Sequence, residues 1–183
     1  MTTVLTPDTV DNFDVMPFVG DNGCLNEAGL KLMAKVADKL PPFHKGKWGP
    51  AFVPVMSKIV PVALELVIVK DRQVLLAWRE DDGFHGTGWH APGTYVGPGE
   101  DWQDTVQRCA DREIKASVEF EREIGIFNMV DSPRFHGISV LVLCRIHGEP
   151  QAGQWFERCP KDMLDVHKRF VLVINGLLGW YSY

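Results

Sequence analysis

Apolar residues in the middle of the chain form two short runs that a polar segment separates. Residues 62–69 and 73–79 are mostly apolar, and Lys70, Asp71 and Arg72 lie between them. Two apolar runs of this length joined by a short polar turn are typical of a β-hairpin. The pattern therefore predicts that the central part of the chain begins with two antiparallel strands.

A different periodicity follows residue 100. Val106, Ala110 and Ile114 recur every fourth residue, which predicts a helix over about 103–115 with one buried face. Glu100 and the acidic residues that follow it are typical of a helix start, where negative charge is favourable.

The remaining segments complete the pattern of one α/β domain with an addition at its N-terminus. The apolar run 140–146 and the segments 154–156 and 160–175 follow this helix in the sequence. Near the N-terminus, Asn26 can cap a helix that continues to about Leu40. The apolar positions of that helix lie on one face: Leu30, Met33, Ala37 and Leu40. A basic loop is expected at 43–50.

Composition agrees with one substantial globular domain. The chain has 183 residues, of which 45% are hydrophobic and 23% are charged. Its net charge of −5 excludes broad nucleic-acid binding, because extended Lys/Arg clusters are also missing from the sequence. Apolar runs shorter than the ~18 residues of a membrane span, and an N-terminus without a signal-like pattern, favour a cytoplasmic protein. The four cysteines lack zinc-ligand spacing, and reduced thiols are expected.

The loop before the central helix carries the chemical signal. Residues 92–100 read Pro-Gly-Thr-Tyr-Val-Gly-Pro-Gly-Glu, and with Arg108 and Glu113 they resemble a degenerate Nudix box. The family pattern, G-x5-E-x7-R-E-U-x-E-E-x-G-U with U aliphatic, forms a loop, a helix and a second loop. Glu100, Arg108 and Glu113 match it, and Gly93 lies at its usual flank. Three positions depart from the pattern: Cys109, Arg112 and Lys115.

The resemblance covers roughly residues 59–176. It implies strands at the apolar run 140–146 and at 154–156, and a last helix within 160–175. It implies a Nudix-type α/β/α sandwich with a mixed central sheet over residues 59–183. Residues 1–58 would form an N-terminal helical extension that packs on the core. Three roles stay open for this extension: covering the substrate cleft, making a dimer contact in a homodimer, or extending the core.

The resemblance also implies a divalent cation, Mg²⁺ or Mn²⁺, that neutralises the oxygens of a pyrophosphate. Glu113 and the Gly93 carbonyl are its expected ligands, and Glu100 and Glu149 are further candidates. Glu100 alternatively orients the helix start. Cys109 shares a helical face with Glu113, but a thiol is a poor ligand for a hard cation. One ion is therefore expected instead of the cluster of a complete box.

Substrate contacts follow from a closer resemblance within the superfamily. The helix is similar to that of the GDP-mannose mannosyl hydrolase branch, which keeps the arginine and the last glutamate of the box. This similarity implies that Arg79 clamps a diphosphate. Tyr95, where that branch has an arginine, is a further candidate contact, as are Arg134 and His136. Arg108 is either a catalytic charge beside the site or a structural partner of an acidic residue such as Glu100 or Asp104.

The general base is sought in the loop before the segment 154–156. His147 and Glu149 both lie there, and either group can titrate usefully beside a cation. Two functions stay open. The first is a metal-dependent hydrolase of a nucleoside diphosphate linked to a sugar or a similar group, with that small molecule as partner. The second is a catalytically silent Nudix fold that binds a nucleotide or a protein.

Overall fold

The computed structural model describes residues 14–45 and 51–178 of the chain. It separates the chain into two compact units, with the boundary after Gly46. The predicted loop 43–50 is described only as far as residue 45, and its remainder lies outside the described residues. The packing of an N-terminal extension on the core stays a prediction.

The first unit contains a short 3-10 helix, η1 (Met16–Phe18), and the helix α2 (Glu27–Ala37). Asn26 caps α2 as predicted, because its side-chain oxygen accepts a hydrogen bond of 2.9 Å from the Gly29 amide. The helix ends at Ala37 and not at Leu40, since the chain turns before the two prolines that follow.

The apolar face predicted for α2 does not pack into a core. Leu30 and Met33 on this face are both exposed. Within its own unit α2 contacts mainly η1 and the turn between them, so these side chains have little apolar surface to cover.

A mixed sheet forms the centre of the second unit. β1 is its middle strand, in the order β3-β2-β1-β6-β5, with β4 added beside β1 and β7 beside β2. β1 runs parallel to β6 and antiparallel to both β2 and β4. The strands are β1 (Val62–Lys70), β2 (Gln73–Arg79), β3 (Gly88–His90), β4 (Gly93–Tyr95), β5 (Ser117–Met129), β6 (Gly137–His147) and β7 (Gln154–Phe156).

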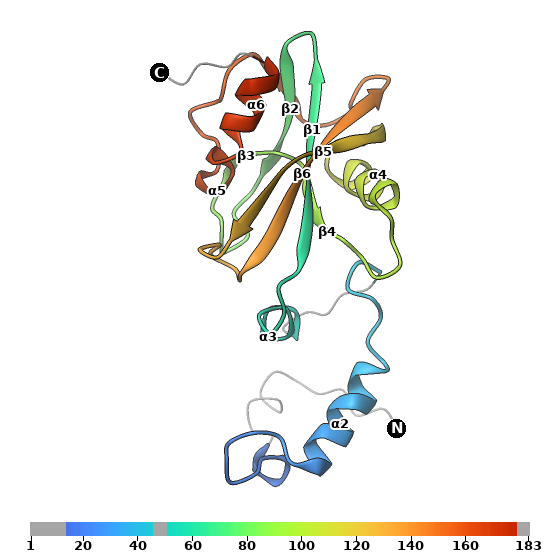
Figure 1. Ribbon diagram of the computed structural model, residues 1–183, viewed down its shortest axis with the longest axis vertical. Helices are drawn as coiled ribbons and strands as arrows, with labels where there is room; N and C mark the ends of the chain where they lie inside the picture. The colour runs from blue at the N-terminus through green and yellow to red at the C-terminus, as the bar shows by residue number, and fades with distance from the viewer. Residues whose placement is uncertain (1–13, 46–50, 179–183) are drawn as a thin grey trace. The chain divides into compact units, whose positions relative to one another are not determined.

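Helices cover both faces of this sheet, which confirms the predicted three-layer sandwich (Figure 1). α4 (Trp102–Glu113) packs its buried residues against Leu64, Leu66 and Ile68 of β1. On the opposite face α6 (Val171–Leu178) packs against Val67, which points the other way from the same strand. Two short helices complete the unit: α3 (Phe52–Met56) and α5 (Asp165–Lys168).

Local sequence explains where α4 begins and ends. Asp101 and Asp104 form a capping box at its start, each side chain accepting from the backbone amide of the other residue. The predicted stripe of Val106, Ala110 and Ile114 is fully buried. After the helix, Lys115 adopts a left-handed conformation with φ of 51°. This is the position where the Nudix pattern has glycine, so the structure supports the register taken from the sequence.

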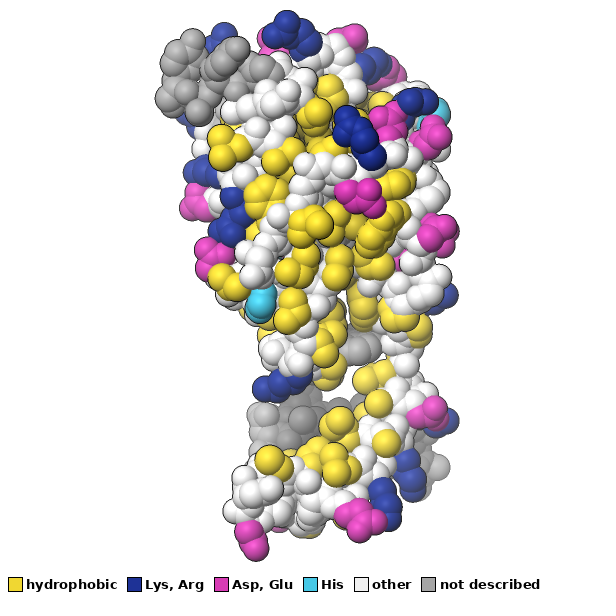
Figure 2. All heavy atoms as spheres, viewed as in Figure 1, with side chains coloured by type: hydrophobic (Ala, Val, Ile, Leu, Met, Phe, Trp, Pro, Cys, Tyr) yellow, Lys and Arg dark blue, Asp and Glu magenta, His cyan; other side chains and the backbone are white. Residues whose placement is uncertain are grey.

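The edge strand β5 presents apolar surface. Figure 2 shows apolar side chains gathered on the face of the sheet unit where β5 and β6 lie in Figure 1. Ile126 of β5 is 71% exposed. A homodimer stays a prediction.

Among the residues that the structure describes, none of the helices combines the length and apolar character needed to cross a membrane. The cytoplasmic location also stays a prediction.

We expect Lys115→Gly to stabilise the protein by about 0.5–1 kcal/mol, because glycine removes the Cβ that disfavours left-handed backbone. The free energy of unfolding in urea measures the effect. Lys115→Ala is the matched control: it shortens the side chain but keeps the Cβ, so its unfolding free energy should stay near that of the parent. Equal stability of the glycine and alanine variants would contradict the argument.

Candidate functional site

The site lies where β1 changes its pairing partner from β4 to β2. The first half of β1 pairs with β4, with Glu65 opposite Gly93, whereas its end pairs with β2. Between these two pairings the Leu66 amide donates to the Pro92 carbonyl. Side chains from β1, β3 and α4 reach this split in the sheet, and they include the box residues.

Arg108 joins the box loop to the strand before it. Its guanidinium donates to both oxygens of Glu100, at 2.6 and 2.7 Å, and to the Tyr95 carbonyl at 2.8 Å. Another of its nitrogens donates to the Thr94 hydroxyl at 3.0 Å. These four hydrogen bonds support a structural role for Arg108, which is one of the two roles expected for it.

The Glu100 carboxylate already accepts hydrogen bonds from several groups in this arrangement. Besides Arg108, it accepts hydrogen bonds from the Gly97 amide and the Thr105 hydroxyl. The hydrogen bond from Arg108 is the main reason why the pKa of Glu100 falls to about 2, despite partial burial. The geometry fits a residue that orients the loop and the helix start.

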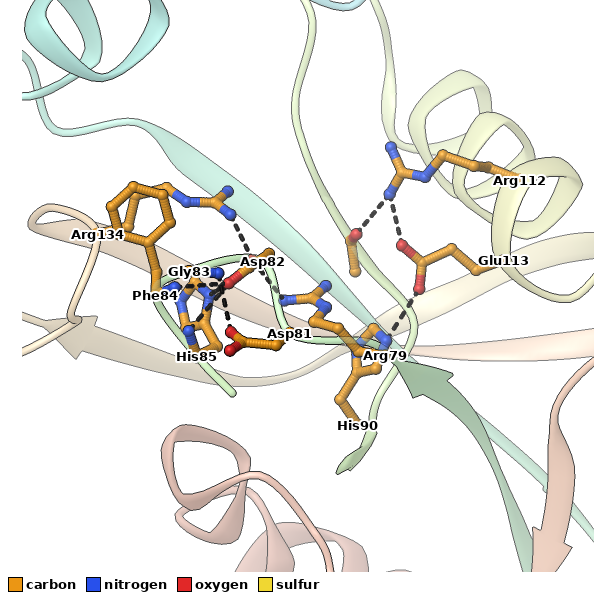
Figure 3. A network of polar contacts seen from close by, with 11 residues as sticks. Arg79, Asp81, Asp82, Gly83, Phe84, His85, His90, Arg112, Glu113 and Arg134 are labelled. Carbon is orange, nitrogen blue, oxygen red and sulfur yellow. Dashed lines mark hydrogen bonds and ion pairs between the residues drawn. The ribbon is translucent and has the colours of Figure 1, made fainter. Parts of the chain in front are cut away.

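Arg112 bridges the two groups expected to hold a cation. Its Nη2 donates to the Gly93 carbonyl at 2.9 Å and to Glu113 Oε1 at 2.6 Å. Figure 3 shows Arg112 and Glu113 pointing toward one another at the end of α4. The Arg112 side chain is 54% exposed and that of Glu113 only 12% exposed. The structure brings Glu113 and Gly93 to one guanidinium, and the sequence did not show that Arg112 lies between them.

The second oxygen of Glu113 faces a buried histidine. His90 Nε2 lies 3.4 Å from Glu113 Oε2, which is buried and accepts no hydrogen bond. Burial lowers the pKa of His90 to about 3, and the charges of Arg79 and Arg112 act in the same direction. The imidazole is therefore neutral at physiological pH. A backbone hydrogen bond with Ala91 opposes this lowering of the pKa only in part.

Glu65 is a site residue that the sequence analysis missed. Its carboxyl lies against Gly93 so closely that a Cβ on Gly93 would be 2.0 Å from Glu65 Oε2. The Ser139 hydroxyl donates to the other oxygen at 3.1 Å. Burial raises the pKa of Glu65 to about 8, while Ser139 and Arg79 partly oppose the shift and Glu113 adds to it. The signal was visible as a single carboxylate inside an otherwise apolar strand.

Arg79 and Arg134 lie on either side of Asp82. Arg134 donates to Asp82, and an Arg79 nitrogen lies 4.0 Å from the same carboxylate. Figure 3 shows Arg79 between this group and His90. Partial burial raises the pKa of Asp82, but hydrogen bonds from His85, from the backbone and the charge of Arg134 together lower it below its usual range. The structure thus brings two predicted substrate-binding arginines together.

Tyr95 belongs to an aromatic group beside these arginines. Its ring lies 5.6 Å from that of Phe135 and 6.3 Å from that of Phe52, measured between centroids. Burial raises the pKa of the Tyr95 hydroxyl, and the nearby Arg134 partly offsets this. Tyr95 and Arg134 are therefore neighbours, as a shared role in substrate binding requires.

Three predicted residues have other partners. Glu149 accepts a hydrogen bond from Lys70, and His147 lies 3.4 Å from Glu119. His136 forms a hydrogen bond with Asn128, near the C-terminal end of β5. Glu65 and Lys70 are five positions apart on β1, so Lys70 lies about 16 Å along the strand from Gly93 at the usual rise per residue. The structure does not bring these three side chains to the Gly93–Glu113 pair.

Cys109 lies in the core and not at the site surface. It is fully buried with the apolar residues between α4 and the sheet. Burial raises the pKa of its thiol well above the usual range, so it is neither a thiolate nucleophile nor an anionic ligand. Position 109 contributes packing here, although it shares a helical face with Glu113.

The oxygens at Gly93 and Glu113 fit one cation and not a cluster. The buried Oε2 of Glu113 accepts no hydrogen bond, and the Gly93 carbonyl faces the same space as Oε1, where Arg112 now supplies positive charge. Among the residues that the structure describes, no group of three or more His, Cys, Asp or Glu side chains could hold a metal ion. A cation here would need ligand atoms from substrate or water as well.

A family model described as NUDIX domain matches residues 60–172 of the chain. The low-salt glycan biosynthesis protein Agl8 of Haloferax volcanii is 32% identical over 85 residues, which are 46% of this chain and 54% of that protein. The chain thus spans about half the length of this curated relative.

Solved structures share the fold at low sequence identity. A UDP-X diphosphatase is 14% identical with a TM-score of 0.54, and the match covers 84% of this chain and 82% of that one. A bifunctional NMN adenylyltransferase/ADP-ribose pyrophosphatase from Francisella tularensis, complexed with AMP and a manganese ion, is 15% identical with a TM-score of 0.53. That match covers 70% of this chain and 47% of that one. These likenesses support the sandwich fold.

We expect Arg108→Gln to destabilise the protein by about 2 kcal/mol near neutral pH, because it leaves Glu100 without its main partner. The folded-state pKa of Glu100 lies below its usual value, so its contribution is present above pH ~4.5 and is lost toward pH ~2. Urea unfolding at about pH 7 and pH 3 should show a smaller difference between parent and variant at the lower pH. A difference that does not depend on pH would contradict the pairing.

We expect Glu65→Gln to stabilise the protein by about 1–3 kcal/mol at pH 7. The folded-state pKa of Glu65 is raised to about 8, so ionisation favours the unfolded chain as pH rises from about 4.5 toward 8. The gain in melting temperature should be small at about pH 5 and larger at about pH 8. The exposed Glu119→Gln serves as a matched control with little effect at either pH. An equal gain at both pH values would refute the burial argument.

Proposed function

Because the chain belongs to the NUDIX domain family, we propose that it hydrolyses a nucleoside diphosphate linked to a sugar or a similar group. The observation that carries this proposal is that the Gly93 carbonyl and the Glu113 carboxylate converge on one guanidinium at the split in the sheet, with Arg79 close to His90. A glycan biosynthesis protein among the similar proteins favours a sugar-linked substrate, and a UDP-X diphosphatase favours a nucleoside diphosphate derivative.

One divalent cation, Mg²⁺ or Mn²⁺, would be held by the Gly93 carbonyl and the Glu113 carboxylate. Both are oxygen ligands of the kind that these hard cations prefer. When bound, the cation neutralises phosphate oxygens and polarises the bond to be cleaved. His90 supports this site by filling the space behind Glu113 as a neutral ring, which keeps the carboxylate side chain in place.

Arg79 and Arg134 would bind the diphosphate. Both are partly buried and both lie close to Asp82, which limits the positions that their guanidinium groups can take. Planar guanidinium groups held in this way match the oxygens of phosphate groups. Tyr95, beside Arg134, would contact the remainder of the substrate.

We propose Glu65, instead of Glu149 or His147, as the general base. It lies against Gly93, whereas those two side chains pair elsewhere. A carboxyl with a pKa near 8 can exchange a proton in the working range of an enzyme. We therefore propose that Glu65 accepts or holds the proton of the attacking water.

The bridging position of Arg112 favours a second candidate function. If its guanidinium keeps its hydrogen bonds to the Gly93 carbonyl and Glu113, no cation can use these oxygens, and the protein would bind a diphosphate without cleaving it. A screen with nucleotide sugars, ADP-ribose, dinucleoside polyphosphates and nucleoside triphosphates, in the presence of Mg²⁺ or Mn²⁺, separates the two candidates by product identity. Binding without products would support the second.

We expect Glu113→Gln to reduce divalent-dependent turnover roughly 100-fold or more, because it removes the only carboxylate ligand proposed on α4. Hydrolysis rates over a series of Mg²⁺ concentrations measure this. Glu157→Gln, at an exposed carboxylate near Gln73, makes the same chemical change away from the site and should keep parental rates. Parental turnover in Glu113→Gln would overturn the role of Glu113 in hydrolysis.

A further inference from the structure

The position of Arg112 has a specific consequence for cation binding. Its Nη2 lies 2.9 Å from the Gly93 carbonyl oxygen and 2.6 Å from Glu113 Oε1. A Mg²⁺ ion that used the same two oxygens would lie about 2.0–2.1 Å from each. The nitrogen and the ion would therefore overlap, and only one of them can be present at a time.

The contacts that hold Arg112 in place are few and open to solvent. Besides the two bonds from Nη2, its Nη1 reaches the Thr94 hydroxyl at the long distance of 3.4 Å. More than half of the side chain is exposed, so water and salt weaken its pairing with Glu113. Arg108 differs, since four hydrogen bonds anchor it to the loop and β4.

The surface beside α4 offers a place for a released guanidinium. An open hollow runs along the outer side of the helix and includes two carboxylates. It is lined by Gln103, Asp104, Gln107, Arg108, Asp111 and Arg112. Asp111 and Arg112 both line this hollow, so a guanidinium released from Glu113 would remain beside a carboxylate.

We propose that Arg112 is a built-in competitor of the divalent cation, a role that rests on the cation site of the proposed function. In the absence of a cation its guanidinium neutralises Glu113 and occupies the Gly93 carbonyl. A divalent cation enters only by displacing it. Arg112 therefore sets the cation concentration at which the site fills, and the protein needs more free cation than it would with a neutral residue at this position.

The experiment measures Mn²⁺ binding without substrate, by calorimetric titration and by the electron paramagnetic resonance signal of free Mn²⁺. Arg112→Gln should bind Mn²⁺ at least about tenfold more tightly than the parent, which corresponds to about 1.4 kcal/mol. Arg112→Lys keeps a positive donor at the same place and should stay near the parent. The double variant Arg112→Gln/Glu113→Gln should lose the gain, because the freed carboxylate is then missing.

Arg145→Gln provides the matched control. Arg145 is an exposed arginine on β6 that pairs with Glu121 and Glu119, away from Gly93. It makes the same change in net charge and should leave the Mn²⁺ affinity unchanged. Circular dichroism melting curves of all variants show that each is folded at the temperature of the titration.

Each result decides the proposal. Tighter binding in Arg112→Gln alone supports competition, including the case in which the parent binds no Mn²⁺. Equal affinity in parent and Arg112→Gln, an equal gain in Arg145→Gln, or no binding in any variant overturns it. Absence of turnover in the substrate screen together with tighter Mn²⁺ binding in Arg112→Gln would refute the hydrolase and leave the competition standing.

Discussion

The clamp made by Arg108 is the interaction on which the geometry of the site depends. One guanidinium on α4 binds the loop through Glu100 and the strand β4 through Thr94 and the Tyr95 carbonyl. Gly93 directly precedes these two β4 residues, and Glu113 follows Arg108 on the same helix. Because Arg108 joins the two elements, the Gly93 carbonyl and the Glu113 carboxylate are held opposite one another.

The site contains several buried polar groups whose electrostatics are unfavourable. Glu65 is buried against Gly93, and Glu113 presents a buried oxygen that accepts no hydrogen bond. Burial without enough donors raises the pKa of Glu65 and holds His90 neutral. Arg79 and Arg112 offset part of this cost. Perturbed groups of this kind gather at functional sites, where the extensive apolar packing around them supplies the stability that they lack.

The departures from the Nudix box have separate structural effects. Cys109 replaces a carboxylate with a buried, uncharged side chain that packs between α4 and the sheet. Arg112 replaces another with a cation that binds the remaining carboxylate. Both changes make the site less negative than a complete box would be. Lys115 changes only the backbone preference after the helix and leaves the path of the chain intact.

The sequence by itself determined the fold and the frame of the site. Two apolar runs joined by a polar turn marked β1 and β2, and apolar residues at every fourth position marked α4, because buried surfaces must be apolar. The spacing of Glu100, Arg108 and Glu113 marked the box, since these contacts lie within one short stretch of chain. Tertiary structure decided the rest. Glu65, His90 and Gly93 come from different strands, so only sheet pairing brings them together. Whether Arg112 points to solvent or between Gly93 and Glu113, and whether Glu149 and His147 reach the site, depended on side-chain directions and strand lengths that local patterns do not encode.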